Sequence, residues 1–122
     1  SCEMSAALIR CLLAVYALSE NFEIIASKDV AQLLGVKRPT VHRSLQVLQE
    51  RGMIQKELYG DVHLTEEGRA LAEKLEAQRD DLALLFARTF GLLPEESVKA
   101  AFALMSELSD ESLAQLAAYR AE

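Results

Sequence analysis

The hydrophobic residues of this chain recur over long stretches at spacings of three and four, the period of an amphipathic helix. The first such stretch is apolar nearly all round, which predicts a buried helix. The fourth is long enough to form one extended helix. Helices are expected over residues 5–19, 27–34, 39–51 and 66 to about 90, and from Pro94 and Ser109 onward. The chain is therefore predicted to be mainly α-helical.

The second and third helical stretches are short and are joined by a tight turn. Ser27 is a suitable N-cap for the second helix, and Gly35 can adopt the left-handed conformation that ends it. Pro39 suits the first turn of the third helix, which Gly52 ends. Three apolar residues of that helix are expected to face inward: Val41, Leu45 and Leu48. Two helices joined in this way are typical of a helix-turn-helix.

A strand pattern follows the helix-turn-helix. Residues 53–58 and 62–64 are predicted to pair as a β-hairpin, with a tight turn at residues 59–61. Thr65 is expected to cap the long helix that comes next. A two-stranded ribbon in this position is the wing of a winged helix-turn-helix. We assign residues 5–64 to a winged helix-turn-helix domain that binds DNA.

The remaining residues, 65–122, are assigned to a helical dimerisation region. The long helix carries leucines near the 3.5-residue period, including Leu71, Leu75 and Leu82. A domain this small cannot cover so long an apolar stripe, so part of it is expected to pack against a second subunit. The chain is therefore predicted to be a homodimer.

The charge of the chain is unevenly distributed. The net charge is −6, and residues 1–63 contain seven Lys and Arg against seven Asp and Glu, so the whole acidic excess lies after residue 63. Residues 37–56 contain five cations against Glu50 alone. A basic segment on a helix-turn-helix indicates binding to double-stranded DNA.

Several other classes of protein find no support. No stretch of about 18 apolar residues lacks charge, so no membrane span or membrane partner is expected, and the apolar run near the start does not resemble a signal peptide. The two cysteines, Cys2 and Cys11, are too few for a disulfide framework, which favours the cytoplasm. No catalytic constellation or phosphate-binding loop occurs, so the protein is predicted not to be an enzyme.

Three segments of the first half resemble many bacterial winged-helix repressors, including MarR-type regulators: residues 27–36, 39–41 and 48–54. The very short wing at residues 59–68 narrows the resemblance to metal-dependent repressors of the DtxR (diphtheria toxin repressor) and manganese-repressor type. The segment Phe90-Gly91-Leu92 and the later Leu108-Ser109-Asp110-Glu111 are similar to the dimerisation region of that family. The family's additional C-terminal β domain is not expected here.

The metal ligands that this resemblance implies are not present at the matching positions. Those positions hold apolar, cationic or small residues: Arg10, Leu13, Arg79, Ala83, Phe102, Met105 and Ser106. Such groups are poor ligands for a divalent cation. We expect the family's metal switch to be lost and neither metal nor cofactor to be bound. An unrelated site remains an alternative, because Glu76 and Asp80 are four residues apart on one helix.

Candidate DNA contacts come from the outward side of the helix-turn-helix and from the wing. They are Ser27, Lys37, Arg38, Pro39, Thr40, Arg43, Gln46, Lys56 and Tyr59. Arg43 is the leading candidate for a base contact, since a guanidinium can donate two hydrogen bonds to guanine, and a phosphate contact is its alternative role. Tyr59 could contact phosphate or pack at the end of the hairpin.

The function predicted from the sequence is a homodimeric, sequence-specific transcriptional repressor. One alternative is a MarR-like regulator with a small-molecule effector between the DNA-binding lobe and the dimerisation helices. A second is a winged-helix module that binds proteins and not DNA. Cys11 is either a redox-sensing thiol or a small buried hydrophobe.

Overall fold

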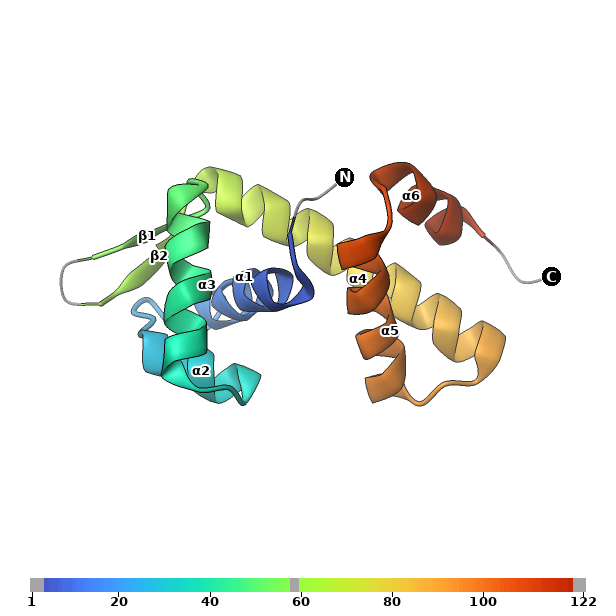
Figure 1. Cartoon of the computed structure of the whole chain (residues 1–122), viewed down its shortest axis with the longest axis horizontal. Helices are drawn as coiled ribbons and strands as arrows, with labels where there is room; N and C mark the ends of the chain where they lie inside the picture. Colours follow the sequence, from blue (N-terminus) through green and yellow to red (C-terminus); the bar gives the residue numbers. More distant parts are fainter. Residues whose placement is uncertain (1–3, 58–59, 120–122) are drawn as a thin grey trace. The chain divides into compact units, whose positions relative to one another are not determined.

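The computed structural model describes residues 4–57 and 60–119. Most of these residues are helical, and a single antiparallel hairpin follows the third helix, which confirms the predicted fold class (Figure 1). The elements are α1 (Ala6–Ser19), α2 (Ser27–Leu34), α3 (Arg38–Glu50), β1 (Ile54–Lys56), β2 (Val62–Leu64), α4 (Glu66–Phe90), α5 (Pro94–Glu107) and α6 (Asp110–Ala118). Among the described residues, no helix is both long and apolar enough to cross a membrane.

The chain divides into two compact units. The first unit comprises residues 10–73, and the second comprises residues 74–119 with residues 4–9. The division falls inside α4, between residues 73 and 74, nine residues after the boundary assigned between residues 64 and 65. The first unit therefore includes the first two turns of α4.

The core of the first unit forms around α3. Val41, Leu45 and Leu48 are each at most 1% exposed, as expected from their spacing of four and three along the helix. α1 contributes a nearly continuous run of buried residues, and β1 and β2 contribute Ile54 and Val62. The opposite side of α3 is consequently left in solvent.

The start of α2 differs from the prediction. Ala26, not Ser27, is the N-cap, and the carboxylate Oδ2 of Asp29 accepts a hydrogen bond from the Ala26 backbone nitrogen at 3.0 Å. Asp29 lies in the first turn of α2, where a negative side chain is favoured by the helix dipole. Gly35 ends the helix with φ +67°, as predicted.

The first strand of the wing is shorter than predicted, because Met53 and Glu57 both lie outside β1, and the wing has an additional neighbour. Met53 is not part of β1, because its backbone nitrogen donates to the Leu48 carbonyl at 2.9 Å and so closes the end of α3. The hairpin pairs Ile54 with Leu64 and Lys56 with Val62. Ala26 forms an isolated bridge with Asp61, an interaction that sequence periodicity did not reveal.

Thr65 connects the wing to α4 as predicted. Its Oγ1 accepts a hydrogen bond from the Gly68 backbone nitrogen at 3.0 Å and donates one to the Gly52 carbonyl at 2.6 Å. Gly68 lies directly against the carbonyl of Met53, and a Cβ atom at this position would collide with that carbonyl. A glycine is therefore required where α4 passes over the end of α3.

The second unit packs the rest of α4 with α5 and α6. Its buried apolar residues include Leu75, Leu82, Ala101, Phe102, Met105 and Leu113. Ser109 caps α6 as predicted, accepting a hydrogen bond from the Ser112 backbone nitrogen at 3.1 Å. Large apolar side chains also remain exposed in this unit, at Leu84, Phe90, Leu92, Leu93 and Tyr119.

Candidate nucleic-acid interface

The exposed side of α3 carries most of the predicted DNA contacts. Because Val41, Leu45 and Leu48 face inward, the residues between them face solvent. Exposed side chains on this surface belong to Lys37, Arg38, Pro39, Arg43, Gln46 and Gln49, while Thr40 is half-buried. The structure thus brings six of the predicted contact residues to one helix and its N-cap.

This surface is strongly cationic. Lys37 is the N-cap of α3, followed by Arg38 and, five residues further on, by Arg43. The first turn of the helix contains no acidic residue, and Glu50 at its far end is the single carboxylate of α3. A helix that presents uncompensated cations and amides can bind phosphate and hydrogen-bond to base edges.

The wing contacts α3 through His42, a residue that was not among the predicted DNA contacts. The ammonium Nζ of Lys56, on β1, lies 3.2 Å from Nδ1 of His42, an exposed residue of α3. His42 directly precedes Arg43 and is exposed. This position in the sequence could have identified His42 as a candidate DNA contact. Lys56 is half-buried, and its contact with His42 brings it next to the exposed side of α3.

Ser27 does not belong to this surface, and Tyr59 cannot be placed. Ser27 is half-buried in the first turn of α2, beyond the N-cap. Tyr59 lies outside the described residues, so its predicted phosphate contact stays a prediction.

The positions matched to the family's metal ligands do not fit a divalent cation. Leu13, Phe102 and Met105 are buried apolar residues, each at most 6% exposed. Arg79 forms ion pairs with Asp80 at 2.9 Å and with Glu76 at 4.0 Å, so both carboxylates of the alternative site have a cationic neighbour. Among residues 4–57 and 60–119, no three His, Cys, Asp or Glu side chains cluster as a metal site.

Cys11 lies in the middle of α1 and is 1% exposed. Burial raises the pKa of its thiol from 9.0 to about 12. The reactive form of a cysteine is the thiolate, which is scarcely populated at neutral pH when the pKa is so high. This environment favours the interpretation of Cys11 as a small buried hydrophobe.

A helix-turn-helix, a hairpin wing and a cationic outer face define the winged-helix class of nucleic-acid-binding folds. Residues 15–84 match the family model described as the HVO_A0261 N-terminal domain, and the chain belongs to this family. It is also homologous to metal-dependent regulators of the DtxR type, which confirms the resemblance drawn from its motifs.

Among curated proteins, the chain is 33% identical over 85 residues to the transcriptional regulator MntR of Escherichia coli O6:H1, covering 70% of this chain and 54% of that protein. The manganese regulator SloR superposes with a TM-score of 0.78 at 24% identity, over 89% of this chain and 51% of SloR. ScaR with bound Zn²⁺ superposes with a TM-score of 0.68 at 25% identity, again over 89% and 51%. The chain thus spans about half the length of these relatives. MntR and SloR are regulators and not enzymes.

Proposed function

We propose that this protein binds double-stranded DNA and represses transcription as a homodimer. The observation that carries the proposal is the exposed cationic surface of α3, with Lys37, Arg38 and Arg43 on the helix and Lys56 beside it on the wing. The relatives support the same conclusion, since MntR is a transcriptional regulator. A protein of this kind would act in the cytoplasm, where DNA is accessible.

In this proposal α3 enters the major groove. The first turns of a recognition helix meet base edges, and Arg43, the sixth residue of α3, would donate to guanine O6 and N7. Thr40 and Gln46 would contact neighbouring bases. Lys37, Arg38, Lys56 and Ser27 would contact phosphates, and so would Tyr59 on the wing. Phosphate contacts position the protein, and base contacts provide sequence specificity.

Dimerisation is proposed through the second unit. Its exposed large apolar residues include Leu84 on α4, and Leu92 and Leu93 in the connection to α5. Exposed apolar side chains gathered in one unit are typical of a surface that a partner covers. A two-fold dimer would bind an inverted repeat whose half-sites are about one helical turn of DNA, or a multiple of it, apart.

Binding is further proposed to be independent of divalent metal. Leu13, Phe102 and Met105 have no ligand atoms that suit manganese, and Arg79 places a positive charge at another implied ligand position. This would distinguish the protein from ScaR, which binds Zn²⁺.

The test is selection from a randomised duplex pool at low and at physiological salt, with chelator and then with added manganese, iron or zinc. The expected result is selective binding that is unchanged by metal. The triple variant Lys37→Ala, Arg38→Ala, Arg43→Ala should lose binding, whereas the control Glu95→Ala, on the exposed start of α5, should retain it.

Metal-dependent binding would refute the loss of the switch. Absence of binding even at low salt would refute DNA recognition and favour a protein-interaction module. Sedimentation equilibrium of the same sample tests the dimer.

A further inference from the structure

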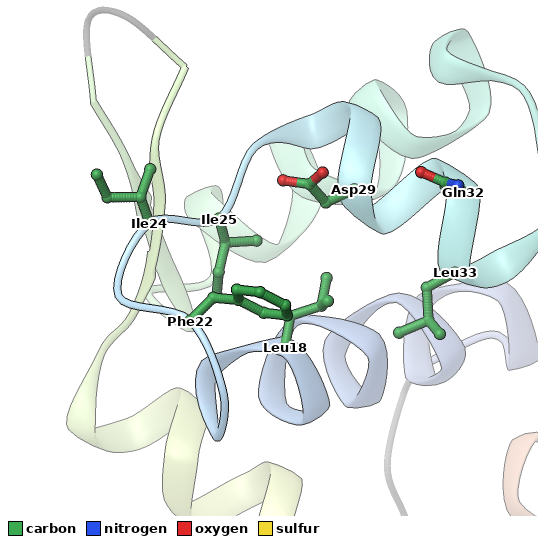
Figure 2. Close-up of a pocket in the computed structure, with 7 residues that line it drawn as sticks. All are labelled: Leu18, Phe22, Ile24, Ile25, Asp29, Gln32 and Leu33. Carbon is green, nitrogen blue, oxygen red and sulfur yellow. The ribbon is translucent and has the colours of Figure 1, made fainter.

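A second candidate site lies in the first unit, between the end of α1 and α2. It is a cavity of about 360 Å³. Figure 2 shows the side chains that line it, which come from α1, from the loop before α2, and from α2 itself. They are Leu18, Phe22, Ile24, Ile25, Asp29, Gln32 and Leu33. This volume is in the range of sites that bind small molecules.

Most of the exposed large apolar side chains in the described part of the first unit line this pocket. Among the described residues of this unit, four large apolar side chains are substantially exposed. Three of them line the pocket: Phe22, Ile24 and Leu33. The fourth is Val36, which does not line it. The exposed fractions of Phe22, Ile24 and Leu33 are 60%, 66% and 54%. Apolar side chains concentrated around one concave site indicate binding of an apolar ligand.

Two polar side chains accompany this apolar wall. Asp29 is the single ionisable residue of the lining, and Gln32 follows one turn later on α2. Within the described residues, the Asp29 carboxylate accepts a hydrogen bond through one oxygen, Oδ2, from the Ala26 backbone nitrogen. A carboxylate at the edge of an apolar pocket favours a ligand that carries a positive charge or a strong hydrogen-bond donor.

We propose that this pocket binds a small, mainly apolar molecule with a cationic head group, and that its occupation lowers the affinity of the protein for DNA. The apolar body would lie against Phe22, Ile24 and Leu33, and the cation would lie next to Asp29. The regulatory part of the proposal rests on the proposed DNA-binding function, whereas the binding part does not.

The pocket is coupled to both DNA-binding elements through short connections. The backbone carbonyl of Ile25 accepts a hydrogen bond from the Val62 nitrogen of the wing at 2.8 Å, and the neighbouring Ala26 forms the bridge with Asp61. α2 is connected to α3 by three residues and packs against it. A molecule inserted beneath α2 therefore acts on the elements that set the position of α3 and the wing. Coupling between two such sites typically changes affinity about fivefold or more.

The ligand class can be tested with three probes that share a naphthyl body and differ in the head group: naphthylethylamine, naphthylethanol and naphthylacetate. Binding is measured on the whole chain, without DNA, from shifts of backbone amide resonances. The expected order of affinity is amine, then alcohol, then acetate, with the largest shifts at residues 22–33. Asp29→Asn should abolish the preference for the amine, because the asparagine oxygen can still accept the Ala26 hydrogen bond while the charge is lost.

Leu33→Ser should weaken the binding of all three probes. Val36→Ser is the matched control, because Val36 is an exposed apolar residue of the same unit that does not line the pocket. Absence of binding, or binding that Leu33→Ser leaves unchanged, would overturn the site. Concentration-dependent shifts at residues 22–33 without any probe would mean that a second copy of the chain covers it, which also overturns the proposal.

The regulatory part is tested by repeating the DNA titration with naphthylethylamine present. A loss of affinity of about fivefold or more in the wild type, absent in Leu33→Ser, is the expected result. Probe binding with unchanged DNA affinity would overturn the regulation and leave the DNA-binding function intact. Probe binding by a protein that does not bind DNA at all would instead be a failure of the proposed function.

Discussion

Lys56 and His42 are joined by a hydrogen bond of 3.2 Å between Nζ and Nδ1, so the wing and the recognition helix share a side-chain contact. An ammonium group has three donors and no acceptor, so Nδ1 of His42 must be the acceptor. A neutral imidazole then carries its proton on Nε2 and can donate a hydrogen bond from there. His42 is therefore suited to donate to guanine, to thymine O4 or to a phosphate oxygen.

The tautomer of His42 can be observed directly. Two-bond ¹H–¹⁵N correlation spectra of the wild type, recorded at a pH where the ring is neutral, should show the proton on Nε2. Lys56→Met removes the donor and should shift His42 toward a mixture of tautomers, while His63, on the exposed side of β2, should be unchanged in both spectra. A wild-type His42 protonated on Nδ1 would contradict the contact.

Base recognition by Arg43 predicts a loss that depends on sequence. Arg43→Ala should cost about 1–3 kcal/mol of specific binding and relax the preference at one position of each half-site. Lys37→Ala, a phosphate contact in this scheme, should weaken binding to all sequences about equally and reduce the slope of affinity against salt by about one. Titration of both variants against the selected and a scrambled duplex, over a salt series, separates the two roles. Equal losses on both duplexes for Arg43→Ala would assign Arg43 to phosphate.

Much of this interface could be predicted from the sequence because it depends on local spacing. The inward positions of Val41, Leu45 and Leu48 follow from helical periodicity, and they determine which residues of α3 face solvent. The caps at Thr65 and Ser109 were likewise predicted from residue type and position.

The features that escaped prediction depend on contacts between distant or competing residues. Lys56 and His42 are fourteen positions apart, and the Ala26–Asp61 bridge joins residues on either side of the whole helix-turn-helix. At the start of α2, Ser27 and Asp29 are both good capping residues, and which of them accepts the hydrogen bond depends on where the preceding loop enters the helix. Periodicity contains no information on such choices.

Gly68 offers a test of the packing between α3, the wing and α4. In an exposed helix, replacing glycine by alanine stabilises by about 1 kcal/mol through backbone propensity. At Gly68 the opposite sign is expected, because the added methyl group would meet the Met53 carbonyl. We expect Gly68→Ala to lower the free energy of unfolding by about 1–3 kcal/mol, measured by urea denaturation.

The exposed neighbour Ala70 is the matched control, where Ala70→Gly should also destabilise, by about 1 kcal/mol. A stabilised Gly68→Ala would show that α4 does not approach Met53 so closely.

Because the thiol of Cys11 is buried, the free energy of unfolding is expected to depend on pH. Its thiol has a pKa of about 12 in the folded protein because burial opposes the charged form, and it returns to the ordinary value of 9.0 when the chain unfolds. Below pH 9 both states keep the proton, so the group has no effect on stability there. Above pH 9 the unfolded chain loses the proton that the folded protein retains, so the free energy of unfolding falls by about 1.4 kcal/mol per pH unit.

The measurement is urea denaturation of the wild type and of Cys11→Ala at pH 7, 9 and 10.5. Cys11→Ala should be less stable than the wild type at pH 7, because a buried side chain is truncated, and the difference should shrink by about 2 kcal/mol at pH 10.5. Lysine and tyrosine titrate in both proteins and cancel in the comparison. A difference that stays constant with pH would mean that the thiol ionises as readily in the folded protein as in the unfolded chain, and would reopen the interpretation of Cys11 as a redox-sensing residue.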